Sequence, residues 1–413
     1  MRGKKYIYIL AALVFSVSVL SQCKNSQGEK KDPRGPAFAG AGKCRTCHPS
    51  VYDSFLLSAH YAASAAATPG NIQGSFLEGQ NEFAFEDNSK VKMEQRGSRP
   101  FQVLYINGEE AGSKPFEISF GIKKAQSWLY WTGNNTYQLP VSYYTSVHSW
   151  GLSPGYTSQF PEFNRLVGRN CFECHSSNIN YLHTIAGGLP DTGIMSLAGR
   201  EEMDRLSLVT GIDCERCHGP AAEHVRFHEQ NPAEKKGRFL VAIAGTGRQE
   251  QLDACAVCHS GNDQVKLKSR FLFRPGDTLS AFFRPPTDTF IKTELDVHGN
   301  QYGLLRQSRC FTQSTTLTCK NCHDPHRDAD NSLSYYSAQC MNCHKEGSPS
   351  FCTVKPAAGV LLTENCIDCH MPNQPSAAIS FKLSGSLQRY SYLLRTHRIA
   401  VYGREGEKLP AGK

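Results

Sequence analysis

Residues 319–326 read Cys-Lys-Asn-Cys-His-Asp-Pro-His, and the first five of them form the pattern that decides the fold of this chain. Two cysteines are separated by two residues, and a histidine follows the second cysteine directly. The pattern occurs seven times in the sequence, and every C-x-x-C pair has its histidine. Numbered 1 to 7 along the chain, the motifs are Cys44/Cys47/His48, Cys171/Cys174/His175, Cys214/Cys217/His218, Cys255/Cys258/His259, Cys319/Cys322/His323, Cys340/Cys343/His344 and Cys366/Cys369/His370.

This spacing is the attachment signature of c-type haem. Two thiols three positions apart can each form a thioether with a vinyl group of the porphyrin, and the adjacent imidazole then binds the iron from one face. Paired C-x-x-C sequences also build structural zinc sites, and a single exposed pair can be redox-active, but neither chemistry requires a histidine after every pair. The sequence therefore predicts seven covalently attached haem c groups.

Eight of the 15 histidines lie outside the motifs, and they are candidates for the second axial ligand of each iron. Eight candidates for seven irons favour haems bound by two histidines, which are six-coordinate and suited to electron transfer. Imidazole is a preferred iron ligand, so five histidines are predicted to be distal ligands: His60, His224, His298, His326 and His397. Three others stay open as ligands: His148, His183 and His228.

The N-terminus indicates export. Residues 1–5 are basic, and the apolar run over residues 6–20 suits a signal peptide because a membrane-spanning helix needs about 20 residues. The run ends at Leu20-Ser21-Gln22-Cys23, which resembles a bacterial lipobox except at Gln22; ordinary cleavage beside an unmodified Cys23 is the alternative. We predict a signal peptide over 1–22, a polar tether over 23–42, and a lipid-anchored chain in the periplasm or on the outer-membrane or cell surface.

Composition limits the remaining classes. Only 39% of the 413 residues are hydrophobic, which excludes a polytopic membrane protein. Removal of Arg2, Lys4 and Lys5 with the signal peptide lowers the formal charge from +8 to +5, and haem propionates add negative charge, so we expect no nucleic-acid partner. Cys310 and Cys352 belong to no motif, and the sequence leaves open whether they form a disulfide in an oxidising compartment.

Strand-like alternation fills part of the long gap between motifs 1 and 2. It predicts a small antiparallel sheet inserted between haem 1 and haem 2, which either covers haem edges or docks a partner. The alternating segments are Lys90–Glu94, Phe101–Ile106, Phe116–Phe120 and Trp128–Trp131, and Asn107-Gly108 is one of the turn signals between them.

From Cys171 onward we expect short helices and long loops wrapped around porphyrins, which replace much of an aliphatic core. The predicted class is therefore mainly α with long loops. We predict two regions, with haem 1 and the β-rich insert in 43–170 and haems 2 to 7 in 171–413.

Several short stretches carry a family resemblance. They are Ser58-Ala59-His60, residues 139–143 with 153–156, Cys-His-Gly-Pro at 217–220, residues 307–310, Cys-His-Asp-Pro-His at 322–326, Cys-His-Met-Pro at 369–372 and Thr-His-Arg-Ile at 396–399.

With these stretches the chain resembles the exported multihaem cytochromes c related to the hydroxylamine oxidoreductase and pentahaem nitrite reductase superfamily. The resemblance implies a chain of stacked and perpendicular haem pairs, with the same five histidines as distal ligands. Ammonia-forming nitrite reductases use C-x-x-C-K at the catalytic haem, whereas all seven motifs here end in His, and the tyrosine cross-link of hydroxylamine oxidoreductases has no counterpart.

Three functions are compatible with these observations. The favoured hypothesis is an electron-transfer protein that exchanges electrons with other cytochromes or a quinol-oxidising complex. The alternative is an oxidoreductase with one open haem that acts on a small nitrogen or sulfur compound. In that enzyme His148, His183 or His228 would donate protons, and Arg165 or Arg169 would steer an anion. A third hypothesis treats the β-rich insert as a binding module and the haems as structural. The sequence does not indicate the oligomeric state.

Overall fold

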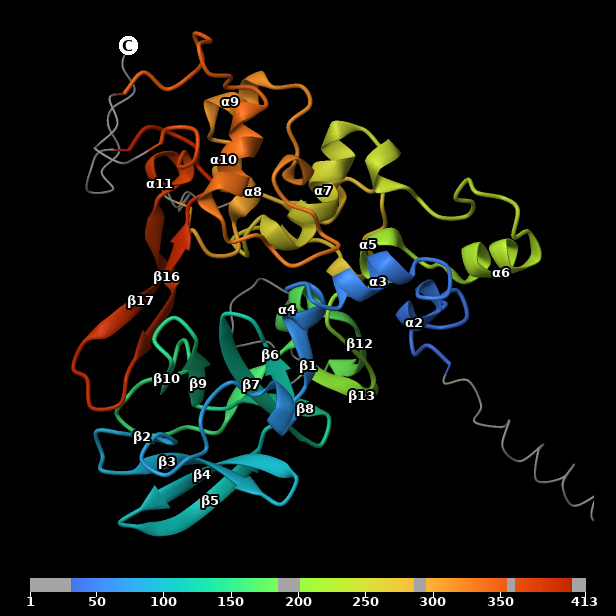
Figure 1. The fold of residues 1–413 in the computed structure, drawn as a ribbon. Helices are drawn as coiled ribbons and strands as arrows, with labels where there is room; N and C mark the ends of the chain where they lie inside the picture. The colour runs from blue at the N-terminus through green and yellow to red at the C-terminus, as the bar shows by residue number, and fades with distance from the viewer. Residues whose placement is uncertain (1–30, 185–200, 286–294, 355–360, 403–413) are drawn as a thin grey trace, which may run out of the picture.

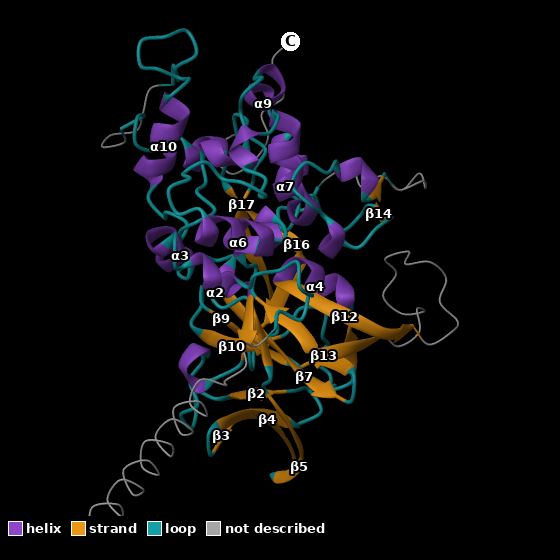
Figure 2. Cartoon of the chain, turned by 90° about the vertical axis from the view of Figure 1, so that its right-hand side faces the viewer, coloured by secondary structure: helices purple, strands orange, loops and turns teal. Residues whose placement is uncertain are grey.

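The computed structural model describes residues 31–184, 201–285, 295–354 and 361–402. Strands gather in the lower half of the molecule and short helices in the upper half (Figures 1 and 2). Helices make up only 25% of the structure and strands 28%, so the predicted mainly α class is wrong. The predicted signal peptide (1–22) and Cys23 lie outside the described residues. Within the described ranges no helix has the length and apolar character needed to cross a membrane.

The larger sheet has seven strands, and all of its neighbouring strands are antiparallel. Two of its strands leave the main path: β9 (Val141–Tyr144) pairs with both β7 and β10 (Ser149–Leu152). The main path runs through β1 (Ser64–Ala66), β6 (Ile118–Phe120), β7 (Ala125–Thr132), β8 (Asn135–Gln138) and β11 (Arg165–Val167).

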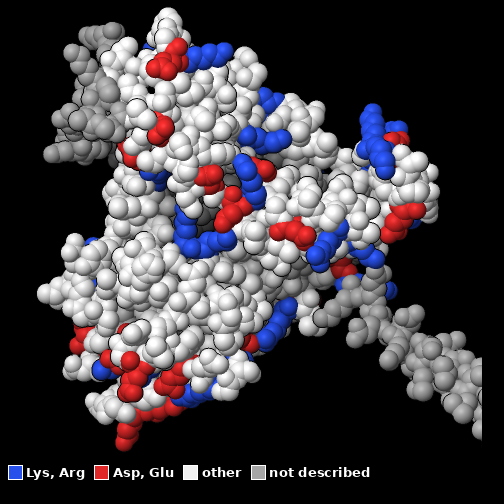
Figure 3. Space-filling model, viewed as in Figure 1, with Lys and Arg blue, Asp and Glu red and all other residues white. Residues whose placement is uncertain are grey.

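A second antiparallel sheet has four strands in sequence order: β2 (Glu82–Ala84), β3 (Lys90–Arg96), β4 (Arg99–Ile106) and β5 (Glu109–Pro115). Asn107 and Gly108 have positive φ and join Ile106 to its partner Glu109, which is the two-residue turn expected of Asn-Gly. Acidic side chains gather on this sheet (Figure 3). The strands predicted over 90–94, 101–106 and 128–131 are confirmed, but the insert is two sheets rather than one small one.

Three further two-stranded sheets explain why the class prediction failed, because all of them lie after motif 2, where the sequence predicted only helices and loops. The C-terminal hairpin also joins the two halves of the molecule: Leu383 bridges Gly151, and Lys382 Nζ lies 2.8 Å from Glu86 Oε1. The three sheets are β12 (Ser176–Thr184) with β13 (Glu201–Thr210), β14 (Val265–Lys266) with β15 (Phe283–Arg284), and β16 (Asn373–Lys382) with β17 (Arg389–Arg395).

The helices are short, and each motif lies on one of them or on an adjoining turn. The 3₁₀ turn η6 (Cys319–Asn321) begins motif 5. The described α-helices are α2 (Ala41–Cys44), α3 (Pro49–Phe55), α4 (Arg169–His175), α5 (Cys214–His218), α6 (Ala222–Gln230), α7 (Arg248–His259), α8 (Gln301–Leu305), α9 (Arg309–Gln313), α10 (Leu333–Met341) and α11 (Ile367–His370).

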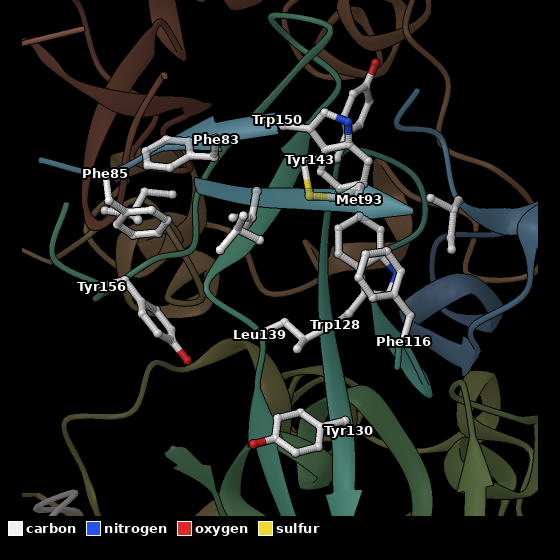
Figure 4. Packing of buried hydrophobic residues seen from close by; sticks show 14 residues of the cluster. Phe83, Phe85, Met93, Phe116, Trp128, Tyr130, Leu139, Tyr143, Trp150 and Tyr156 are labelled. Atoms are coloured by element: carbon white, nitrogen blue, oxygen red, sulfur yellow. The ribbon is translucent and has the colours of Figure 1, made fainter. Parts of the chain in front are cut away.

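The main apolar core lies between the sheets (Figure 4). Trp128 is fully buried there, stacks on Phe116 at 4.7 Å and lies 5.3 Å from Trp150. A second cluster includes Phe172, which lies inside motif 2 and is also fully buried. The β-rich region therefore supports motif 2 through direct packing.

Replacing Trp128 with alanine should destabilise the protein by about 3–5 kcal/mol, because the change leaves a cavity where a large ring packed on two others. Guanidinium unfolding followed by circular dichroism measures the effect. Leu206→Ala is the control, since this side chain is 88% exposed and its loss should change stability by no more than about 0.5 kcal/mol. Equal effects of the two substitutions would contradict this placement of the core.

Candidate functional site

A single helical turn joins the first cysteine of a motif to its histidine. The histidine N–H donates to the carbonyl of that cysteine at 2.9–3.0 Å in motifs 1, 5, 6 and 7. Residues four apart share one face of a helix, so the turn directs the first thiol and the imidazole to the same side. This arrangement suits attachment of a flat ring whose metal lies over the imidazole.

Three motif histidines face a histidine from outside the motifs. The ring centres are 6.3 Å apart for His259 and His60, 5.9 Å for His218 and His326, and 6.2 Å for His323 and His397. A metal bound to two imidazole nitrogens at about 2 Å each places the ring centres roughly 6 Å apart. The three gaps therefore have the width of an iron atom with two axial imidazoles.

Burial keeps these imidazoles in the form that binds metals. Burial and the neighbouring His259 lower the pKa of His60 to about 4, and burial and His323 lower the pKa of His397 to about 4. Burial also lowers the pKa values of His218 and His323. These four imidazoles are therefore neutral near pH 7, as axial ligands must be.

Nδ1 atoms of several imidazoles are occupied by oxygen acceptors. A histidine that donates through Nδ1 leaves Nε2 for a metal, and such contacts set the orientation of the ligand. The pairs are His175 with the Ala63 carbonyl (3.3 Å), His344 with the Ser350 carbonyl (2.6 Å), His370 with the Ala400 carbonyl (2.8 Å), His259 with Gln301 Oε1 (3.3 Å) and His224 with the Arg238 carbonyl (2.7 Å). These residues fit haem c, and nothing in the local sequence marks the acceptors.

The other predicted distal ligands lie near motifs but do not form a ring pair of this width. His298 is close enough to His175 to lower its pKa further, after the larger effect of burial. His224 lies on α6 and contributes to lowering the pKa of His218. Their roles as ligands stay predictions.

The three histidines left open by the sequence occupy different settings. His148 is exposed in the turn between β9 and β10. His183 lies in β12, where the backbone pairing sets it opposite Glu202 of β13. The ring of His228 lies 4.6 Å from that of His224, and its Nε2 is buried without a hydrogen-bond partner among the described atoms.

Thiols of different motifs touch one another and link the motifs in space. Contacting thiols place the edges of two attached porphyrins close together. The contacts are Cys44 with Cys214, Cys174 with Cys258, Cys255 with Cys319 and Cys340 with Cys366. They join motif 1 to 3, motif 2 to 4, motif 4 to 5 and motif 6 to 7.

Two further pairs of cysteine thiols lie near each other and link the remaining motifs. Cys217 lies near Cys255, which joins motif 3 to motif 4, and Cys340 lies near Cys322, which joins motif 5 to motif 6. Neighbouring thiols therefore link the motifs as the series 1-3-4-5-6-7, with motif 2 beside motif 4. Cys310 and Cys352 are free thiols, so the disulfide that the sequence left open is not formed.

Five of the fourteen predicted haem-binding thiols are exposed, and none of them takes part in the thiol contacts that link the motifs: Cys47, Cys171, Cys217, Cys343 and Cys369. Exposure distinguishes these five thiols from the other nine, which are partly buried.

Exposure does not prevent haem attachment at these five thiols. A thioether needs access only to the porphyrin edge, so an exposed thiol can still react with a vinyl group. The neighbouring histidines His344 and His370 are oriented through Nδ1, as described above. Haem binding by all fourteen motif cysteines stays a prediction.

A buried ion cluster holds motif 1 against motif 3. The guanidinium of Arg34 binds Asp32 at 2.8 Å, Asp213 at 2.7 Å and Glu215 at 3.1 Å, and all four side chains are at most 8% exposed. Glu215 also accepts the N–H groups of Ala39 and of residues 40 and 221. Burial alone would lower the pKa of Arg34, but its bonds to Asp32 and Asp213 outweigh burial and raise it.

Replacing Arg34 with leucine should destabilise the protein by about 3 kcal/mol or more, because three buried carboxylates lose their shared cation. Denaturant unfolding of the full chain measures the loss. The matched control is Arg96→Leu, which removes an arginine bound to Glu94 and Glu110 on an exposed sheet and should leave stability almost unchanged. A stable Arg34→Leu protein would show that the cluster does not hold the motifs.

The two arginines predicted to steer an anion make structural contacts instead. Arg165 donates to the Pro154 carbonyl and lies over the ring of Tyr156. Arg169 stacks on Tyr181 at 3.8 Å and pairs with Glu173 at 3.4 Å. The contacts of both guanidinium groups tie them to protein groups.

No protein-family model matches the chain, and no curated protein matches it. Among solved structures, a match is the crystal structure of the outer cell wall cytochrome OcwA. It has a TM-score of 0.48 and 15% sequence identity, and it covers 84% of this chain and 79% of that chain.

Proposed function

We propose that this chain is an electron-transfer protein that carries seven covalently attached c-type haems, most of them bound by two histidines. The observation that carries the proposal is the set of three imidazole pairs with ring centres 5.9–6.3 Å apart, each joining a motif histidine to a distant one. When bound, each haem supplies one-electron chemistry at its iron. The chain supplies the thiols, both imidazoles and the spacing between sites.

The spatial order of the motifs supports transfer rather than storage at isolated centres. Motifs 1 and 7 stand at opposite ends of the linked series 1-3-4-5-6-7. Thiol contacts such as Cys44 with Cys214 and Cys340 with Cys366 bring consecutive sites together. A continuous series of close haems lets an electron enter at one end and leave at the other, as exchange with other cytochromes or a quinol-oxidising complex requires.

The same proposal places the protein outside the cytoplasm. The apolar run over residues 6–20 and Cys23 support export with a lipid anchor, on the periplasmic or cell surface of a bacterial membrane. Haem is attached to C-x-x-C-H motifs outside the cytoplasm, so export and the motifs require each other. Membership of the hydroxylamine oxidoreductase and pentahaem nitrite reductase superfamily stays a prediction.

Electron paramagnetic resonance of the oxidised full-length holoprotein tests the proposal. We expect predominantly low-spin ferric haem and full, reversible reduction by a chemical reductant. Mostly high-spin haem, or haem that no reductant reaches, would contradict a chain of haems bound by two histidines.

One observation directs the search for the alternative, an oxidoreductase with an open haem. Among the described side chains, His48, His175, His344 and His370 have no second imidazole at the distance seen for the three pairs. An open haem would therefore be sought at motifs 1, 2, 6 or 7. A visible spectrum that changes on adding cyanide or nitrite would favour this function, and an unchanged spectrum would remove it.

A further inference from the structure

One carboxylate is completely buried at the junction of three motifs. Glu173 is the residue before the second cysteine of motif 2, and its side chain is 0% exposed. Its carboxylate oxygens lie 3.4 Å from Arg169 Nε, 3.3 Å from Lys266 Nζ and 3.4 Å from Arg270 NH1. Ser269 also donates its hydroxyl to this carboxylate.

The backbone of Glu173 binds the two neighbouring motifs. Its carbonyl accepts from Arg216 of motif 3 at 3.2 Å and lies 3.9 Å from Cys258 Sγ of motif 4. Arg270 also donates from Nε to the carbonyl of Val257, between the cysteines of motif 4, at 2.9 Å. We call the five charged side chains the Glu173 cluster: Glu173, Arg169, Arg216, Lys266 and Arg270.

Arg169, Lys266 and Arg270 contact the carboxylate of Glu173, and Arg216 binds the backbone carbonyl of the same residue, so the five side chains of the Glu173 cluster carry more positive than negative charge. Asp213 adjoins the cluster by accepting the backbone N–H of Arg216. Glu201 touches its edge by accepting the backbone N–H of Arg169. Arg216, Lys266 and Arg270 are each at most about one-tenth exposed, so water screens them weakly. The cluster lies beside Cys174 and Cys258, the touching thiols of motifs 2 and 4.

We propose that the Glu173 cluster raises the reduction potential of the haems attached at motifs 2 and 4, so that electrons rest preferentially at this junction of the chain. The inference rests on the proposed haem-bearing function. A nearby net positive charge favours the ferrous over the ferric state, and charge and hydrogen bonding are among the main means by which a protein sets haem potential. Glu173 acts as a positioning residue in this proposal, since it holds the cations in place and partly offsets their charge.

Charge variants of the full-length holoprotein test the proposal by the sign of the change. Glu173→Gln keeps the shape and removes the negative charge, and Lys266→Met removes one positive charge. In potentiometric titrations, one or two of the haem components should shift upward in Glu173→Gln and downward in Lys266→Met. We expect about a tenfold change in the ratio of reduced to oxidised haem, which is about 59 mV for a one-electron couple. The matched control is Glu110→Gln, which removes an arginine-bound carboxylate from the β4–β5 hairpin and should shift no component.

The outcomes separate this inference from the proposed function. Shifts of the same sign in both variants, or no shift in either, would overturn the inference and leave the cluster as a structural ion network. A wild-type protein without haem would contradict the proposed function instead. If Glu173→Gln binds fewer haems than the wild type, two other variants decide the test: Lys266→Met and Arg169→Gln, whose side chains lie nearer the surface. Both must then lower the reduction potential of one or two haem components. Haem loss in all three variants would also overturn the inference, because the cluster would then act in assembly.

Discussion

Replacing His60 with alanine should convert one low-spin haem into a high-spin haem while the other haems keep their spin state. His60 faces His259 with ring centres 6.3 Å apart, and its removal leaves the iron at motif 4 with a single imidazole. Electron paramagnetic resonance of the oxidised variant measures the new high-spin fraction. Added free imidazole should restore the low-spin state, because it replaces the lost ligand.

His148→Ala is the matched control, since this histidine is exposed in the turn between β9 and β10. It should leave the spectrum unchanged and carry the same number of haems as the wild type. An unaltered spectrum for His60→Ala, with full haem content, would show that His60 is not an axial ligand.

Without covalent haem attachment, the motif-bearing region from residue 171 onward should fail to fold, while the β-rich region stays folded. The apolar cluster around Trp128 contains fourteen buried residues, whereas the two clusters that lie wholly within the motif region contain four each. A region with so small a core needs its ligand to become stable.

Limited proteolysis tests this second prediction on a protein made in a host that cannot attach haem. We expect rapid cleavage after residue 171 and a resistant fragment that contains β1 to β11. The control is the same chain from a host that attaches haem, which should resist cleavage throughout. An apoprotein as resistant as this control would show that haem is not the missing core.

Local sequence signals predicted the parts of the fold that depend on neighbours along the chain. The alternation over 90–94 and 101–106 and the turn at Asn107-Gly108 act within a single hairpin, so they could be read without the rest of the molecule. The strand β13 begins with two glutamates and β16 contains Pro375, which are unfavourable in strands. These strands form because a partner strand and the adjacent half of the molecule hold them, and a linear pattern does not report such contacts.

The candidate site also has features that local sequence predicts and features that depend on the fold. The C-x-x-C-H motif is a single helical turn, so every motif thiol and its adjacent imidazole could be predicted from spacing alone. Spacing does not report burial, and so it did not distinguish an exposed thiol such as Cys47 from one in contact with another motif, such as Cys44. The pairing of His60 with His259 joins residues that are far apart in sequence and follows only from the fold.

Glu173 was missed for a physical reason. A charged residue between two cysteines suggests an exposed position, because an isolated buried carboxylate is costly. Only the cations Lys266 and Arg270, which come from other elements, explain its burial.

Intact-mass spectrometry of the native protein, purified from a host that attaches haem, examines covalent haem attachment without further assumptions. We expect the mass of the processed polypeptide plus seven haems, retained under denaturing conditions because each haem is bound through thioethers. A polypeptide mass with no haem added, from a colourless preparation, would contradict haem attachment and with it the proposed electron transfer.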